Sequence, residues 1–243
     1  MGIFKKLISK IKKNQYVVDV KRLDINQNEE YSSAILKIMN LLNYTKKSFV
    51  SYSGTKFNLG YHSFEIDGHQ FKGQRNPKMR LDGIPFSFKG LSVLDIGCNQ
   101  GGMLYELSKS IRFGVGIDYD SRMINVANKF KSHCNLNHLD YYVFNLETEN
   151  LEFINDFLPE KRVDVVFLLS VCMWIKNWEQ VIDYVTSISS KLIFESNGSD
   201  KQQLEQINYL EKKYKAVQLI REQSIDDPSQ KKRKLYYCAN DKG

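Results

Sequence analysis

The run Leu91–Gly102 constrains this chain more than any other feature. It reads LSVLDIGCNQGG: an apolar strand, a turn that contains glycines, and the start of a helix that continues with Leu104, Leu107 and Ile111. Glycines at a strand-to-helix turn let a ligand approach the backbone closely, and the free N–H groups of the helix can bind its polar atoms. The run therefore predicts a nucleotide-type binding turn in an α/β protein.

A second apolar run, Val115–Ile117, ends in Asp118. An acid at the tip of the second strand of such a unit is placed to bind both hydroxyls of a ribose. The dinucleotide fingerprint G-x-G-x-x-G is not met, because Asn99 stands where that pattern has its second glycine. The spacing is instead D-x-G-x-x-x-G-G, which favours a different nucleotide cofactor.

This run resembles motif I of the class I S-adenosylmethionine-dependent methyltransferases, with Asp118 as the ribose acid. The resemblance implies methyl transfer with S-adenosyl-L-methionine as cofactor. An acid at the end of the third strand commonly contacts the adenine amino group in that family, and the carbonyl oxygen of Asn145 could accept the same hydrogen bond. The cofactor-binding residues implied around the motif are Asp95, Gly97, Cys98, Asn99, Gly101, Asp118, Asn145 and Leu146.

From residue 91 onward, apolar strands alternate with helices, which predicts an α/β fold with a doubly wound, mostly parallel seven-stranded sheet of the Rossmann-like type. Before it we expect an N-terminal extension with a helix from Asn28 to about Lys46 and a hairpin that turns at Asp67-Gly68. The predicted divisions are a basic tail at 1–14, the extension at 15–88 and the cofactor-binding domain at 89–243. The predicted strands are 92–96, 114–117, 141–144, 163–169, 191–195, 216–220 and 235–238.

Candidate catalytic residues follow from position and chemistry. His62 is the first candidate for a general base, because the unperturbed pKa of histidine lies near neutrality. Glu195 is the second, at the carboxyl end of the fifth strand, where ligands bind in such sheets. The family resemblance further implies that Trp174, which follows the fourth strand, borders the methyl-transfer site. Arg75 could pair with the methionyl carboxylate of the cofactor or with an anionic acceptor. Each of these roles has an alternative: His62 and Arg75 could be surface residues, and Trp174 could fill the core.

The net charge of +7 is unevenly spread, because residues 1–14 hold five lysines and no acid, leaving +2 for the remainder. The same segment places Phe4, Leu7, Ile8 and Ile11 on one helical face, which is typical of a helix that lies on an anionic membrane surface. A helix docked on its own domain, or a frayed terminus, is the alternative. No run of about 18 apolar residues and no cleavable signal is found, so we expect a cytoplasmic protein, peripheral to the inner face of the membrane if the tail binds there.

The four cysteines are scattered, with no C-x-x-C pair, which fits a reducing compartment. His133, Cys134 and His138 are close in sequence but form a weak zinc signal, and we expect no metal site.

Three functions remain open at this point. The first is O-methylation of a small molecule or glycan, such as a lipid-linked saccharide, because the layout of Tyr61–Arg80 with motif I resembles bacterial sugar and surface-polysaccharide methyltransferases. The second is methylation of RNA such as tRNA, whose phosphates the tail and Lys231–Lys234 would bind. The near-neutral charge of the rest of the chain fits this function less well. The third is an interaction module that binds the cofactor without transferring its methyl group.

Overall fold

The computed structural model describes residues 32–45, 60–227 and 232–240. Seven strands form one sheet in the order β5-β4-β3-β6-β7-β9-β8. Strands β3 to β7 run parallel, and β9 is antiparallel to both of its neighbours. The strands are β3 (Ser92–Ile96), β4 (Phe113–Asp118), β5 (Leu139–Val143), β6 (Val165–Leu169), β7 (Lys191–Glu195), β8 (Ala216–Arg221) and β9 (Leu235–Ala239).

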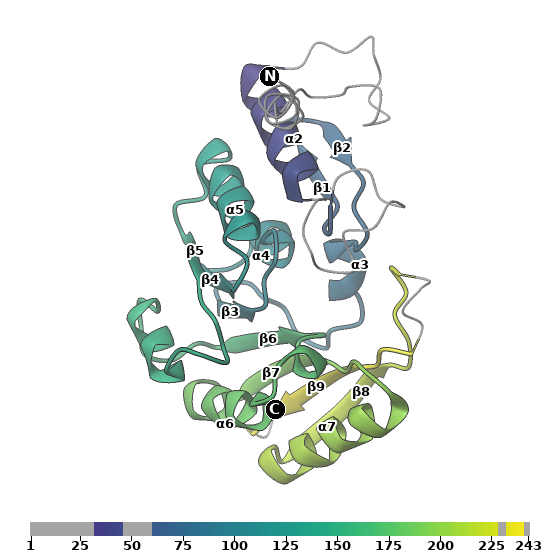
Figure 1. Cartoon of the computed structure of the whole chain (residues 1–243). Coiled ribbons are helices and arrows are strands. Elements are labelled where there is room, and N and C mark those ends of the chain that lie inside the picture. Colours follow the sequence, from purple (N-terminus) through teal and green to yellow (C-terminus); the bar gives the residue numbers. More distant parts are fainter. Residues whose placement is uncertain (1–31, 46–59, 228–231, 241–243) are drawn as a thin grey trace, which may run out of the picture.

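Helices cover both faces of this sheet (Figure 1). One face packs against α4 (Gly102–Leu107) and α5 (Ser121–His133), and the other against α6 (Trp178–Ile188) and α7 (Asp200–Lys213). Neighbouring residues of β3 show the alternation: Val93 joins the core on the α4 side, whereas Leu94 joins the core on the α6 side. Both faces of β3 and β6 are therefore buried, as a central parallel strand requires. The predicted Rossmann-like fold class is confirmed.

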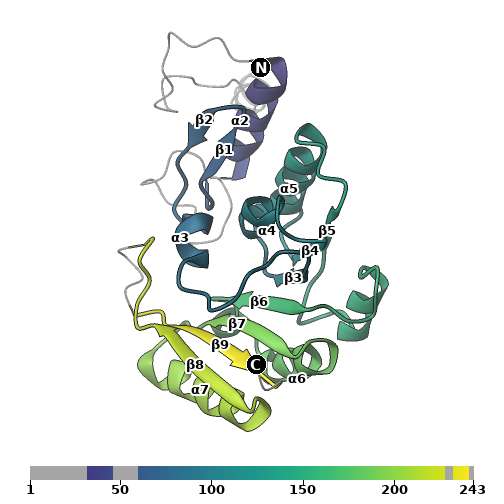
Figure 2. The same cartoon turned by 180° about the vertical axis from the view of Figure 1, so that it is seen from behind.

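The N-terminal extension packs on the outer side of α5 (Figure 2). It contains α2 (Ser33–Thr45), the hairpin strands β1 (Phe64–Ile66) and β2 (His69–Phe71), and α3 (Pro77–Leu81). The hairpin turns at Asp67 and Gly68, whose φ angles of 51° and 80° are those of the expected Asp-Gly turn. Apolar side chains of α2, β1, β2 and α5 form its core: Ile35, Ile38, Met39, Leu42, Phe64, Ile66, Phe71, Val126 and Phe130.

Several predicted boundaries differ from the structure. The strand expected at 141–144 spans Leu139–Val143, because Leu139 already pairs with Gly114 in the parallel register. The helix expected to start near Asn28 begins at Ser33, where the Ser32 hydroxyl accepts a hydrogen bond from the Ile35 amide at 3.2 Å. Residues 1–14 lie outside the described residues. In the part that is described, no helix has the length and apolarity to cross a membrane.

Candidate functional site

The turn between β3 and α4 is built from residues with backbone conformations that most side chains avoid. Gly97 and Gly101 have φ angles of 75° and 74°. A Cβ atom on Gly97 would lie 2.6 Å from Val171 Cγ2, and one on Gly101 would lie 2.6 Å from the Tyr141 ring. Asn99 also lies in the left-handed region, at 51°, which asparagine tolerates better than most residues. These contacts explain why the motif needs its glycines and accepts Asn99.

Asp118 ends β4 directly beside this turn. Its carboxylate accepts hydrogen bonds from the Asn99 amide and from the Asp120 amide, both at 2.9 Å. Burial raises the pKa of Asp118 to about 6, although these backbone hydrogen bonds favour the charged form. A buried carboxylate at the end of the second parallel strand is the acceptor that ribose hydroxyls need.

Four buried polar atoms near this turn have no hydrogen-bond partner among the described residues. One is an acceptor, Oδ2 of Asp95; the others are Nε2 of His62, Nη1 of Arg75 and Nε of Arg80. Burial raises the pKa of Asp95 to about 7, while the positive charge of Arg80 acts in the opposite direction. Buried polar atoms of both kinds require partners. The ammonium and carboxylate of a methionyl group would supply both, so these residues fit S-adenosylmethionine.

His62 lies against the start of α4. Its Nδ1 accepts a hydrogen bond from the Gly102 amide at 3.3 Å, and its own amide donates to Gln100 Oε1 at 2.9 Å. Burial, followed by the charges of Arg80 and Arg75, lowers the pKa of His62 well below its usual value. The ring is therefore neutral with its proton on Nε2. This arrangement suits a hydrogen-bond donor better than the general base predicted from the sequence.

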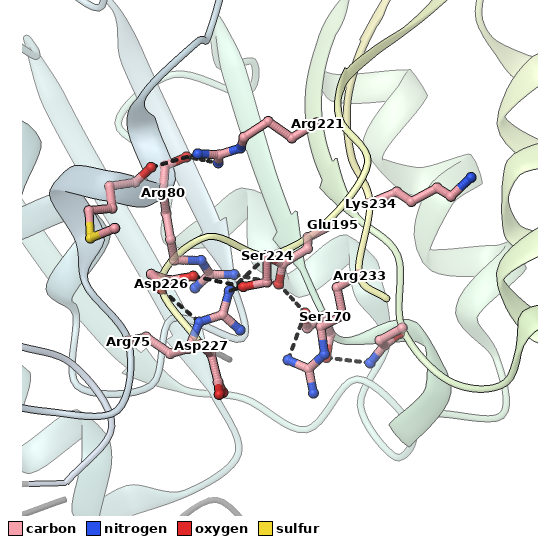
Figure 3. A network of polar contacts seen from close by, with 12 residues as sticks. Arg75, Arg80, Ser170, Glu195, Arg221, Ser224, Asp226, Asp227, Arg233 and Lys234 are labelled. Atoms are coloured by element: carbon pink, nitrogen blue, oxygen red, sulfur yellow. Dashed lines mark hydrogen bonds and ion pairs between the residues drawn. The ribbon is translucent and has the colours of Figure 1, made fainter. Parts of the chain in front are cut away.

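Glu195 is the centre of a buried ion-pair network (Figure 3). Its two oxygens accept hydrogen bonds from Arg75 Nη2 at 2.7 Å and Arg80 Nη2 at 2.8 Å. Arg75 Nε also pairs with Asp226 at 2.8 Å. Burial acts to raise the pKa of Glu195, but Arg80 and Arg75 lower it to about 2. A carboxylate held so firmly in its charged form is a weak proton acceptor, so this environment argues against a base role.

The carboxyl end of β6 leads into an exposed aromatic segment. Ser170 follows the strand with a φ of 62°, and the 3-10 helix Cys172–Trp174 comes next. Trp174 is 53% exposed and Met173 is 37% exposed, so neither fills the core. Asn197 links the segment to the end of β7, because its side chain accepts from the Met173 amide and donates to the Ser170 carbonyl. This segment offers an apolar surface beside the turn after β3.

The remaining predicted cofactor residues have partners within the protein itself. Asn145 Oδ1 accepts a hydrogen bond from the Glu147 amide at 3.0 Å, and the Leu146 carbonyl accepts from Asn177 at 2.6 Å. The Cys98 side chain lies in the core on the α4 side, and burial raises the pKa of its thiol well above the usual value. Their assignment to the cofactor stays a prediction.

The residues of the zinc signal have separate partners. His133 pairs with Asp67, Cys134 contacts the Tyr105 hydroxyl, and the ring of His138 bonds to the Ser108 carbonyl. Across the described ranges, no group of three histidine, cysteine or acidic side chains is placed to hold a metal ion.

Sequence reasoning missed Asp226 and Arg233, and it assigned Arg80 no firm role. Arg80 pairs with Glu195 across 115 positions of sequence, and Arg75 pairs with Asp226 across 151. Nothing in the local pattern indicates such distant pairs. The run Lys231–Lys234 was interpreted as one basic cluster, but Arg233 differs from its neighbours because it donates to the buried Ser170.

Comparisons with known proteins agree with this site. Residues 94–189 match the family model described as a methyltransferase domain. This segment of the chain is therefore a class I S-adenosylmethionine-dependent methyltransferase domain, and its cofactor is S-adenosylmethionine. The search of curated proteins found no match.

Solved structures with the same fold are distant in sequence. The N-terminal domain of EvdMO1, solved with S-adenosylhomocysteine bound, is 10% identical with a TM-score of 0.58, over 86% of this chain and 99% of that domain. YcgJ from Bacillus subtilis is 11% identical with a TM-score of 0.52, over 68% of this chain and 97% of that one. The bifunctional kinase-methyltransferase WbdD is 20% identical with a TM-score of 0.51 over 69% of this chain. The match spans only 40% of the length of WbdD.

Proposed function

We propose that the protein transfers a methyl group from S-adenosylmethionine to an oxygen atom of a small molecule or saccharide. The observation that carries this proposal is the exposed pair Met173 and Trp174, which follows β6 beside the turn that is expected to hold the cofactor. Pockets for small molecules combine aromatic surface with a few well-placed polar groups. Trp174 with Asn197 and Ser170 supplies that combination.

The cofactor supplies the electrophilic methyl group, and the protein orients the two reactants. Asp118 would bind the ribose, and Asp95 with the donors of His62, Arg75 and Arg80 would bind the methionyl group. Glu195 and His62 are both poor bases in their present surroundings. We therefore expect orientation of the acceptor to contribute more to the rate than proton removal by a side chain.

A saccharide acceptor is favoured over RNA. EvdMO1, which shares the fold, was also crystallised in the presence of S-adenosylhomocysteine and D-fucose. The basic residues near the C-terminus do not form a row of unpaired charges in the described part: Lys232 pairs with Asp200, and Lys234 pairs with Glu222. The basic tail at 1–14 would bring the enzyme to lipid-linked saccharides at the cytoplasmic face of a membrane, as a step in polysaccharide synthesis.

The test has two stages. Calorimetric titration of S-adenosylmethionine and S-adenosylhomocysteine should show binding that Asp118→Ala weakens about tenfold or more, on the order of 1.4 kcal/mol. Asp140→Ala is the matched control, because Asp140 is a partly exposed acid on the next strand that pairs with Lys131. Transfer of a labelled methyl group to saccharides and to tRNA should then favour saccharides. Absence of cofactor binding would reject the proposed methyl transfer. Labelling of tRNA and not of saccharides would show that the acceptor is RNA instead of a saccharide.

A further inference from the structure

Arg233 is held at the carboxyl edge of the sheet by its neighbour in the chain. The Ser196 amide donates to the Lys234 carbonyl at 2.9 Å, and the Lys234 amide donates to Ser196 Oγ at 3.0 Å. Ser196 directly follows β7, so these bonds place Arg233 where β6 and β7 end. This is the edge at which ligands bind in doubly wound sheets.

The guanidinium of Arg233 has no carboxylate of its own among the described residues. Its Nη1 donates to the neutral hydroxyl of Ser170 at 3.1 Å, and Ser170 in turn donates to Glu195 (Figure 3). Both oxygens of Glu195 are already paired with Arg75 and Arg80. Arg233 thus reaches the acidic centre of the network only through a hydroxyl group.

The surroundings of Arg233 disfavour an uncompensated positive charge. Burial lowers the pKa of its guanidinium, and Arg75 and Arg80 add repulsion, although Tyr61 and Glu195 act in the opposite direction. A partly desolvated cation without a counter-ion is costly, and an oxyanion that binds it gains strong, charge-assisted hydrogen bonds. Arginine is also the side chain best suited to carboxylate and phosphate groups, which its planar donors bind in pairs.

Ser170, the hydrogen-bond partner of Arg233, lies on the side of the site where the methyl acceptor would bind. Ser170 is a non-glycine residue in the left-handed region, at a φ of 62°, and such strain is typical of functional positions. Ser170 opens the segment that carries Met173 and Trp174. An acceptor that lies on this aromatic segment would therefore have Arg233 beside it, whereas the methionyl group would lie near Asp95 and His62.

We propose that Arg233 binds an oxyanion of the acceptor, so that the enzyme acts on acidic saccharides, which carry a carboxylate or a phosphate group. This inference rests on the proposed function, because it names the class of saccharide that the same site accepts. Trp174 would contact the sugar ring, and Arg233 would bind the acidic group and fix the orientation of the ring.

Binding of matched sugars to the full-length chain saturated with S-adenosylhomocysteine tests this proposal. The probes are glucuronic acid, glucose 1-phosphate and glucose, titrated calorimetrically into wild type, Arg233→Gln and Lys232→Gln. Lys232→Gln is the matched control, because it removes the same charge from the adjacent, exposed residue that pairs with Asp200. We expect one acid to bind wild type and Lys232→Gln about tenfold or more tightly than glucose does, and Arg233→Gln to lose that preference. The acid that is preferred distinguishes a carboxylate from a phosphate.

Three binding results would overturn the inference. Neither acid binds more tightly than glucose, the preference for the acid persists in Arg233→Gln, or Arg233→Gln weakens the binding of S-adenosylhomocysteine as strongly as it weakens the binding of the acid. The last result would assign the guanidinium to the cofactor. Methyl transfer is measured separately, so the two proposals can fail independently. Acid binding through Arg233 without transfer would reject the enzyme proposal alone, and methylation of neutral sugars at equal rates by wild type and Arg233→Gln would reject this inference alone.

Discussion

Asp95 in β3 and Asp118 at the end of β4 are both acids of the motif, but they differ in what surrounds their carboxylates. Asp118 is stabilised by two backbone amides, and burial leaves its pKa at about 6. Asp95 keeps one oxygen without a partner in the described structure, and burial raises its pKa to about 7. Because the folded protein favours the protonated form of Asp95, ionisation of this carboxyl costs stability as the pH rises from about 4 to about 7. A cationic group beside Asp95 would offset that cost.

This relation predicts a pH dependence of cofactor binding. The ammonium of S-adenosylmethionine interacts favourably with ionised Asp95 only, so binding below pH 7 must release a proton. Affinity should rise by up to about tenfold per pH unit between pH 6 and pH 7, more steeply below pH 6 where Asp118 also titrates, and level off near pH 7. Calorimetry in two buffers with different ionisation enthalpies measures both the affinity and the protons released.

The variant Asp95→Asn distinguishes the contributions of the two carboxyl groups to the pH dependence of binding. In this variant the plateau should begin near pH 6 instead of pH 7, because only Asp118 still titrates in the site. A plateau that stays near pH 7 in Asp95→Asn would show that another group controls binding.

Contact between two elements determines the shape of the turn after β3. Helix α4 begins at Gly102, and a Cβ atom on this glycine would lie 2.5 Å from Cγ of His62, which comes from the N-terminal extension. The close approach allows the Gly102 amide to donate to the His62 ring. The extension therefore helps to hold the start of α4 in place, and through it the cofactor turn.

A double-mutant cycle should measure this contact. Gly102→Ala in the wild-type background is expected to lower the free energy of unfolding by about 1–3 kcal/mol, because the added methyl group overpacks the His62 ring. In the His62→Gly background both the ring and the Cβ atom of residue 62, which would lie 2.7 Å from the added methyl group, are absent. The same change should then be neutral or slightly stabilising, since alanine favours helices over glycine. Urea unfolding of the four proteins gives the coupling energy. Equal penalties in both backgrounds would contradict the contact.

The elements that could be predicted from the sequence are those with a local signal. Apolar runs located β3 and β7 at their observed bounds, and Asp67-Gly68 identified the hairpin, because strand propensity and turn chemistry act over a few residues. The motif likewise located Asp95 and Asp118. The network around Glu195 could not be predicted, because Arg75 and Arg80 are more than a hundred positions from the acids that they pair with and meet them only in the folded chain. The base role of His62 was inferred from the ordinary pKa of histidine and that of Glu195 from its position at the end of a strand, and the buried neighbours of both residues argue against these roles.

At the scale of the whole molecule, charge is divided between two parts of the chain. Residues 1–14 carry five of the seven net positive charges, and the remaining 229 residues are close to neutral. The charged groups of the described site largely compensate one another, since arginines and carboxylates alternate around Glu195. Attraction to an anionic surface would therefore come from the tail, and the domain itself would contribute little.

Liposome flotation tests this division of charge. The full chain should float with vesicles that contain an anionic phospholipid and should be released as salt is raised, because the attraction of lysines to headgroups is screened within about 10 Å at 0.1 M salt. A variant lacking residues 1–14 should not float, although it should bind S-adenosylhomocysteine as the full chain does. Replacing Leu7 and Ile8 with serine keeps every lysine and removes part of the apolar face, so weaker flotation of that variant would show that side chains enter the lipid boundary. If the shortened chain floats as well as the full chain, the membrane role of the tail is wrong. The enzyme would then have to meet its saccharide away from the bilayer or through another surface.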